Sequence, residues 1–236
     1  MALPRTIDVT TSWMASVLRL GAGMFAVHAG TRRPEQPLEL YEFEGCPFCR
    51  KVREALTMLD LPVVVYPCPK GGEVYRPKVV QEGGREMFPY LVDPNAGIGM
   101  YESSDIIRYL YETYGNRSAP WWLHSDISLP LGSLASVVRT PGGVFRRASV
   151  APVEPLELYS FEASPYCRIA REALCELELP YRLINVGKRS AARAAFRERS
   201  GRMMVPWLHD PNSGTDMFES GDIAAYLRRT YGRADA

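Results

Sequence analysis

The feature that most constrains the fold is an internal duplication. Residues Pro37–Glu44 read PLELYEFE, and Pro155–Glu162 read PLELYSFE. Further along, Met87–Leu110 and Met204–Leu227 match at more than half of their positions. Self-similarity of this density indicates that one structural unit occurs twice along the chain. A chain of 236 residues has room for two small domains.

The duplication extends upstream of these segments. Ala15–Arg19 reads ASVLR, and Ala135–Arg139 reads ASVVR. A removable targeting peptide would have no counterpart in mid-chain. We therefore expect a short amphipathic segment before each unit, at Thr11–Phe25 and at Leu131–Phe145. A targeting role, or a surface for a partner or membrane, stays an alternative for Thr11–Phe25.

Composition narrows the functional class. Hydrophobic residues make up 46% of the chain and charged residues 23%, and this composition is ordinary for a soluble protein. The net charge is +1, so no polyanion partner such as nucleic acid is indicated. The most apolar run, Ser12–His28, is broken by Arg19, so we expect no transmembrane segment. Five cysteines, an odd number, favour a reducing, cytoplasmic compartment over a secreted disulfide framework. A Gly-rich phosphate loop is absent, which argues against a nucleotide-dependent enzyme.

Apolar periodicity and turn chemistry predict an α/β fold for each unit, with the order βαβ and then αββα. The turn residues of Asp93–Gly97 predict a hairpin between the last two strands. In the first unit the expected elements, from strand to final helix, are Leu38–Phe43, Pro47–Leu59, Val63–Tyr66, Val74–Gln81, Tyr90–Asp93, Met100–Glu102 and Ser104–Tyr114. Those of the second unit are Leu156–Phe161, Pro165–Leu177, Tyr181–Val186, Ala191–Arg199, Trp207–Asp210, Asp216–Glu219 and Asp222–Tyr231.

These elements divide the chain into two domains. The first, 1–117, carries a Cys-Pro-Phe-Cys motif, and the second, 132–236, carries Ser-Pro-Tyr-Cys at the matching place. Residues 118–131 form the expected linker. Trp121 and Trp122 are too apolar for a free linker, and we expect them to pack between the halves.

The Cys-Pro-Phe-Cys motif lies where a predicted strand turns into a predicted helix. A Cys-x-x-Cys in this place is typical of a thiol–disulfide redox site. Unpaired N–H groups and the helix dipole at a helix N-terminus favour a thiolate, so Cys46 is expected to be exposed and activated. Cys49, one turn into the helix, would resolve a mixed disulfide on Cys46. Arg50 and Lys51 add positive charge nearby, and Pro47 suits the first helical position.

Two other interpretations of these cysteines are open. A structural zinc site needs four ligands, and no second Cys-x-x-Cys exists among Cys68, Cys167 and Cys175. The histidines are scattered, so we expect no metal site. The two cysteines of the motif could instead be incidental core residues, although the strand, Pro and basic context argue against it. Cys68 is either buried and inert or a third redox thiol.

Three motifs in order resemble the glutaredoxins, most closely the larger glutathione-transferase-like ones and the N-terminal domain of glutathione transferases. The motifs are Cys46–Cys49, Phe88–Pro89 and Glu102–Ser103. The resemblance implies two tandem thioredoxin-like domains and glutathione as cofactor. It further implies that Pro89 is cis and faces the cysteines, that the Phe88 backbone binds the cysteinyl part of glutathione, and that Glu102 and Ser103 hold its γ-glutamyl end. The alternative for Glu102–Ser103 is a plain helix N-cap.

The second unit departs from this pattern. Serine replaces the first cysteine, so the dithiol cycle is not possible there. The other positions are kept, which leaves a possible second glutathione site at Ser164, Cys167, Val205, Pro206, Glu219 and Ser220. A degenerate copy retained for packing is the other interpretation. The all-helical second domain of glutathione transferases is also absent.

The expected function is that of a glutathione-dependent thiol–disulfide oxidoreductase, with Cys46 as nucleophile and Cys49 as resolving thiol. Its partners would be glutathione and a disulfide-containing protein or small molecule. One alternative is transferase-like conjugation or glutathione binding that uses Ser164. Another is a non-enzymatic or iron–sulfur-binding scaffold.

Overall fold

The computed structural model describes residues 23–125 and 142–233. The amphipathic segments expected at Thr11–Phe25 and Leu131–Phe145 lie mostly outside these ranges, as does part of the 118–131 linker. Within the described part of the chain, no helix is long and apolar enough to span a membrane.

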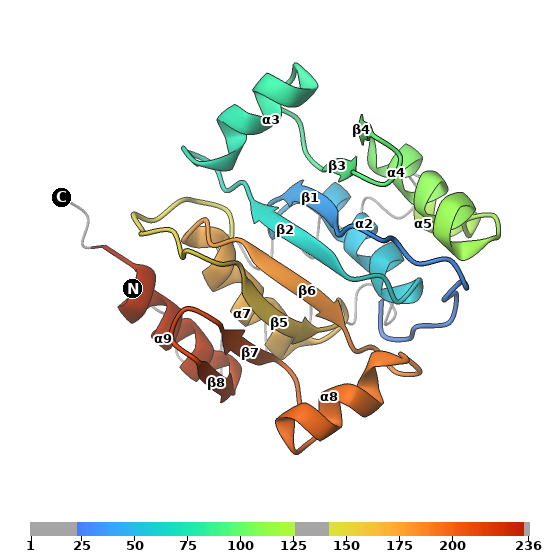
Figure 1. The fold of residues 1–236 in the computed structure, drawn as a ribbon. Coiled ribbons are helices and arrows are strands. Elements are labelled where there is room, and N and C mark those ends of the chain that lie inside the picture. The colour runs from blue at the N-terminus through green and yellow to red at the C-terminus, as the bar shows by residue number, and fades with distance from the viewer. Residues whose placement is uncertain (1–22, 126–141, 234–236) are drawn as a thin grey trace.

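The two halves repeat the same order of elements (Figure 1). The elements of the first half are β1 (Leu38–Glu42), α2 (Pro47–Met58), β2 (Val63–Pro67), α3 (Tyr75–Gly83), β3 (Tyr90–Asp93), β4 (Ile98–Met100), α4 (Ser103–Leu110), a π-helical turn η1 (Tyr111–Gly115) and α5 (Trp121–His124). Those of the second half are β5 (Leu156–Ser160), α7 (Pro165–Glu176), β6 (Tyr181–Asn185), α8 (Ala192–Ser200), β7 (Trp207–Asp210), β8 (Thr215–Phe218) and α9 (Ser220–Tyr231). At the majority of their ends, these elements differ from the sequence prediction by one or two residues. The expected helix 104–114 is divided between α4 and η1.

All of these strands belong to one sheet in the order β4-β3-β1-β2-β6-β5-β7-β8. Within each half, the first two strands are parallel and the hairpin strands antiparallel. The halves join where β2 pairs antiparallel with β6, with Val64 opposite Arg182. Edge strands carry unpaired N–H and C=O groups, so this pairing satisfies the edge of each half with the other.

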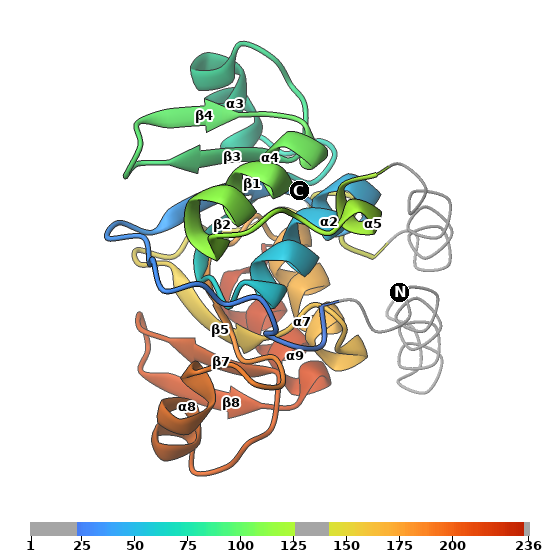
Figure 2. The same cartoon turned by 90° about the vertical axis from the view of Figure 1, so that its right-hand side faces the viewer.

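The helices cover the two faces of the sheet unequally. Helices α2 and α7 lie side by side on one face, next to the junction, whereas α3 and α8 lie on the opposite face near its two ends (Figures 1 and 2). One apolar cluster runs through both halves on the α2 and α7 side and includes Leu56 and Leu174. Smaller clusters lie beneath α3 and α8, around Val79 and Phe196.

A short segment before each half, called a strap below, pairs with the opposite half. The first strap is residues 24–26 and the second is residues 144–146. Ala26 N–H donates to the carbonyl of Lys188, and Lys188 N–H donates to that of Met24, both at 2.8 Å. In the matching exchange, Lys70 N–H donates to the carbonyl of Val144 at 2.7 Å. The straps therefore tie together halves that are far apart in the sequence.

The tryptophans of the linker do not pack between the halves, and that prediction is wrong. Trp121 is 65% exposed and Trp122 37% exposed. They form α5 with Leu123, which is fully buried. One helical turn directs Leu123 into the core, and the two rings then point outward.

Candidate functional site

Cys46 lies at the N-terminus of α2, in the capping position. Its Sγ accepts the backbone N–H of Cys49 at 3.3 Å, and Pro47 begins the helix. Cys46 N–H in turn donates to the carbonyl of Phe43 at 3.1 Å. The expected strand–turn–helix arrangement therefore places both sulfurs in one helical turn, with the first at the end where a negative charge is favoured.

The two thiols have different acidities. Burial raises the pKa of Cys46, but hydrogen bonds from the Cys49 thiol and backbone N–H outweigh it and hold that pKa below its usual value. Burial also raises the pKa of Cys49, and donating its proton toward Cys46 raises it further, well above the ordinary range. A thiolate in this pair therefore resides on Cys46.

The expected exposure of Cys46 is wrong, because its side chain is only 4% exposed. The strap of the second half lies against the residue that precedes Cys46. A Cβ built at the neighbouring Gly45 would lie 2.5 Å from Cγ2 of Val144. By contrast, Phe48 of the same motif is 43% exposed.

The basic residues after the motif point elsewhere. Arg50 Nε lies 3.3 Å from the carboxylate of Glu54 and 3.5 Å from that of Glu162. Lys51 Nζ donates to the carbonyl of Ser125 at 3.0 Å. Hydrogen bonding within the cysteine turn, rather than these two cations, is the direct stabilisation of the Cys46 thiolate.

Phe88 and Pro89 lie beside the cysteine turn. Their peptide bond is cis, as the resemblance implied. The Phe88 ring packs edge-on against Phe43 at 6.2 Å between centroids, and the Arg76 guanidinium lies 4.8 Å from the Phe88 ring. The β3 ladder begins at Tyr90, so the main chain of Phe88 precedes it. Phe43, whose carbonyl accepts the Cys46 N–H, thus connects the two motifs.

Glu102 and Ser103 begin α4, which packs on α2. Glu102 is exposed and has φ of +66°, a left-handed conformation that is uncommon for a residue other than glycine. Ser103 is buried in the first turn, followed by Asp105. The start of α4 therefore lies next to an exposed acidic side chain, that of Glu102.

The second half repeats this arrangement with serine in place of the nucleophile. Ser164 Oγ accepts the N–H of Cys167 at 3.2 Å, and the Val205–Pro206 bond is cis. Glu219 has φ of +66°, and Ser220 begins α9. Ser164 is 4% exposed and Cys167 is fully buried.

The remaining cysteines are buried. Burial raises the pKa values of Cys68 and Cys175 well above the ordinary range, and that of Cys167 less far. These thiols are protonated at neutral pH. Across 23–125 and 142–233, no group of three or more His, Cys, Asp and Glu side chains is arranged to hold a metal ion.

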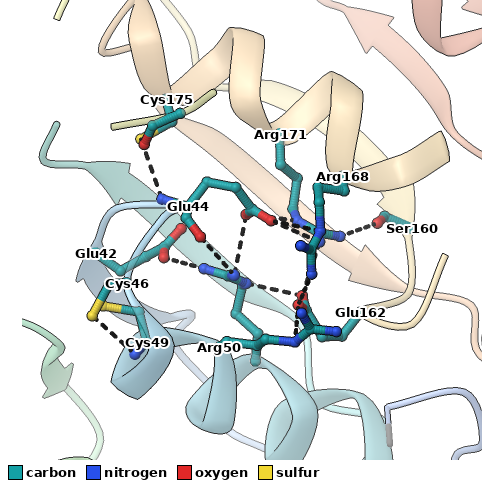
Figure 3. Close-up of polar contacts among 12 residues, drawn as sticks. Glu42, Glu44, Cys46, Cys49, Arg50, Ser160, Glu162, Arg168, Arg171 and Cys175 are labelled. Carbon is teal, nitrogen blue, oxygen red and sulfur yellow. Dashed lines mark hydrogen bonds and ion pairs between the residues drawn. The ribbon is translucent and has the colours of Figure 1, made fainter. Parts of the chain in front are cut away.

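A buried cluster of charges lies between α2 and α7, to one side of the cysteine turn (Figure 3). Arg53 Nε donates to Glu162 of the second half at 2.9 Å, and Arg171 donates to Glu44 of the first half at 3.0 and 3.1 Å. Arg53 also contacts Glu42. All of these side chains are at most 7% exposed. The first and second halves therefore share one ionic network.

Sequence reasoning missed this cluster. A signal was present, because both copies place arginines at matching positions of the predicted helices, namely Arg50 and Arg168, and Arg53 and Arg171. Burial raises the pKa of Glu162, but four surrounding arginines outweigh it and hold that pKa at about 2. Burial and the nearby Arg50 lower the pKa of Arg168 to about 10. Glu162 is therefore ionised and holds arginines from both halves.

Comparison with known families agrees with this architecture. The family model described as the glutathione S-transferase, N-terminal domain matches residues 40–118 and again 158–234. The chain belongs to this family. The double match confirms the expected fold class of two tandem thioredoxin-like units. The division into domains at 117 and 132 stays a prediction.

One solved structure shares part of the sequence. It is a glutathione transferase from Bombyx mori, 28% identical, with a TM-score of 0.33. The match covers 36% of this chain and 39% of that one, so the chain spans about two fifths of that protein's length. No curated protein matches the chain at a significant level.

Proposed function

We propose that this member of the glutathione S-transferase N-terminal family is a glutathione-dependent thiol–disulfide oxidoreductase of a reducing, cytoplasmic compartment. The observation that carries the proposal is the geometry of the cysteine pair at the start of α2, where Cys46 Sγ accepts the backbone N–H of Cys49 at 3.3 Å. Cys46 has a pKa below its usual value, and Cys49 has one well above it. A thiolate nucleophile beside a protonated second thiol is an arrangement that suits thiol–disulfide exchange.

In the proposed reaction the Cys46 thiolate attacks one sulfur of a disulfide. The S–S bond breaks, the leaving thiolate takes up a proton, and a mixed disulfide remains on Cys46. Either the Cys49 thiol or a glutathione thiolate then attacks the Cys46 sulfur and releases the second product. Two glutathione molecules supply the two electrons of a full cycle and leave as glutathione disulfide.

The proposed glutathione site runs from the cysteine turn to α4. The main chain of Phe88, next to Pro89, is suited to pair with an extended peptide. Backbone N–H groups at the start of α4, with the Ser103 hydroxyl, suit the α-carboxylate of the γ-glutamyl residue. The exposed Glu102 carboxylate suits its ammonium group.

The matched geometry of the second half supports a second candidate function. Glutathione binding there would place its sulfur near Ser164, whose hydroxyl occupies the position of the Cys46 thiol. A hydroxyl can donate a hydrogen bond to a bound thiolate, which is the basis of transferase-like conjugation. A scaffold without enzymatic activity, including one that binds an iron–sulfur cluster, stays a further alternative.

Glutathione-dependent reduction of a small mixed disulfide tests the main proposal. We expect the wild type to turn over, Cys46→Ser to be inactive, and Cys49→Ser to keep partial activity because glutathione can resolve the mixed disulfide. Ser164→Ala serves as the matched control and should retain wild-type turnover. If all variants are equally inactive while glutathione still binds by calorimetry, the redox proposal fails. Conjugating activity that survives the loss of both Cys46 and Cys49 but requires Ser164 would favour the second candidate.

A further inference from the structure

We propose that Arg76 is a positioning residue of the glutathione site, which acts by holding the Phe88 ring in place. The inference rests on the proposed redox function and adds to it a residue that sets the preference for glutathione. Arg76 lies in the first turn of α3, and its side chain is 14% exposed. Its guanidinium contacts three separate parts of the first half.

The first contact is with the chain that follows β2. Arg76 Nε donates to the main-chain carbonyls of Cys68 at 3.2 Å and Pro69 at 2.6 Å, and Nη2 donates to that of Cys68 at 3.0 Å. The planar fork of an arginine can hold several acceptors in one fixed geometry. Because β2 pairs with β1, which leads into the cysteine turn, these bonds fix the guanidinium relative to the redox motif.

The second contact is with the loop between α3 and β3, which carries the cis-proline. Arg76 Nη1 donates to the carboxylate of Glu86. The guanidinium carbon also lies 4.8 Å from the centre of the Phe88 ring. A guanidinium is attracted to the face of an aromatic ring, so the cation holds this ring as well as the loop before it. The main chain of Phe88 is the part proposed to pair with glutathione.

The third contact is with the residue that leads into the cysteine turn. The guanidinium carbon lies 6.0 Å from the centre of the Phe43 ring, and that ring packs edge-on against Phe88 at 6.2 Å. The Phe43 carbonyl accepts the Cys46 N–H at 3.1 Å. Arg76 therefore contacts rings from both motifs that a bound glutathione would have to reach, one next to the nucleophile and one on the pairing segment.

Arg76 is suited to act through its neighbours rather than by binding glutathione itself. Each of its three nitrogens already donates to a protein acceptor, on Cys68, Pro69 or Glu86. A displacement of about 1 Å in a group that positions a substrate can lower a rate by up to about a hundredfold. Loss of the guanidinium would free the Phe88 ring and the loop before it, and would so weaken the pairing of glutathione with the Phe88 main chain.

The duplication supplies an internal comparison. Arg193 occupies the position of Arg76, and its Nη1 donates to the carbonyl of Val186, at the end of β6, at 2.8 Å. The contact with the strand end is therefore kept in both halves. The ring and the acid are not, because the second half has Val205 and Met203 at the positions of Phe88 and Glu86. The unit thus folds without them, and they occur in the half that keeps the nucleophilic thiol.

The choice of Cys46 between two disulfides measures this role. Reduced Cys49→Ser protein is mixed with glutathione disulfide or with hydroxyethyl disulfide, quenched with acid at intervals and analysed by intact mass. In both reactions the Cys46 thiolate attacks one sulfur, a mixed disulfide forms, and the other half leaves as a thiolate that takes up a proton. We expect faster reaction with glutathione disulfide, and Arg76→Met in this background should lower the ratio of the two rate constants about tenfold. The rate with hydroxyethyl disulfide should stay unchanged, because that compound has no peptide to pair with Phe88.

A double-mutant cycle with Phe88→Leu tests whether Arg76 acts through the ring. Phe88→Leu removes the ring and keeps the main chain that is proposed to pair with glutathione. Once the ring is gone, Arg76→Met should lower the ratio far less than it does alone, since groups in contact give non-additive effects. Fully additive effects would show that Arg76 influences glutathione by another route, and would overturn the positioning role.

Arg193→Met is the matched control, because it removes the equivalent arginine and its bond to the strand end from the second half. It should leave the ratio unchanged. An equal fall in the ratio with Arg193→Met, or an equal loss of rate with both disulfides in Arg76→Met, would contradict the role of Arg76. A Cys49→Ser protein that reacts with neither disulfide would instead refute the redox function, and one that reacts equally fast with both would refute the glutathione site.

Discussion

Arg171 of the second half donates two hydrogen bonds to the carboxylate of Glu44 in the first half, at 3.0 and 3.1 Å. Arg53 makes the reciprocal contact, reaching Glu162 of the second half at 2.9 Å. The repeat relates the two pairs, so each half provides an acid for the arginine of the other. The halves are therefore expected to unfold together.

Arg171→Met should destabilise the protein strongly. The substitution leaves the buried Glu44 carboxylate short of a partner, which typically costs about 3–5 kcal/mol. Urea unfolding followed by circular dichroism measures the change. The free energy of unfolding should fall in a single transition that includes both halves.

Arg199→Met is the control for that experiment. Arg199 pairs with Glu157 at 2.7 Å, but its side chain is 42% exposed, so the loss should be below about 1 kcal/mol. Equal effects of Arg171→Met and Arg199→Met, or separate transitions for the halves, would show that the buried network does not couple them.

Gly45→Ala tests the contact between the second strap and the cysteine turn. The added Cβ would lie 2.5 Å from Cγ2 of Val144, and such overpacking costs about 1–3 kcal/mol. Val144→Ala should remove most of this cost in the double variant, as measured by denaturant unfolding. Gly221→Ala, at a helical position with open space around its Cβ, should have no such penalty. A cost at Gly45 that Val144→Ala leaves unchanged would refute the contact.

The stability of the protein should depend on Glu42 between pH 4.5 and 7. Its pKa rises from 4.5 to about 7 on folding, so in this window the folded state binds more protons than the unfolded state. The free energy of unfolding therefore falls with rising pH, by up to about 3 kcal/mol from this group. Glu42→Gln should flatten that part of the profile in chemical denaturation. A variant whose profile parallels the wild type would rule out the raised pKa.

Much of the fold follows from residues that the sequence displays. The duplicated segments, the turn at Asp93–Gly97 and the Pro47 helix start predict the elements to within a few residues. The pairing of β2 with β6, which joins the halves, could not be predicted from the sequence. Main-chain N–H and C=O groups make that pairing, and any apolar edge strand provides such groups. The pairing of each strap with the opposite half could not be predicted for the same reason, because Lys70 and Lys188 make these hydrogen bonds through their backbone.

The sequence predicts the positions of the two cysteines in the strand–turn–helix but not their surroundings. Helix geometry alone places Cys46 at the N-terminus of α2 and Cys49 one turn further. Cys46 is buried, and the neighbouring Gly45 lies against Val144, which is distant in sequence. The role of Arg50 was likewise misjudged, because it pairs with Glu54 of its own helix and with Glu162 of the other half. Long-range packing, rather than local propensity, decides these features.

The most direct test of the account is the site of the first covalent step. The Cys49→Ser protein, reduced and exposed to glutathione disulfide at pH 7, should gain one glutathione per chain, and peptide mapping should locate it on Cys46. That result is expected because Cys46 alone among the five cysteines has a pKa below its usual value, whereas those of the other four are raised. An adduct on Cys68, Cys167 or Cys175 in place of Cys46, or no adduct at all, would contradict the assignment of Cys46 as the nucleophile.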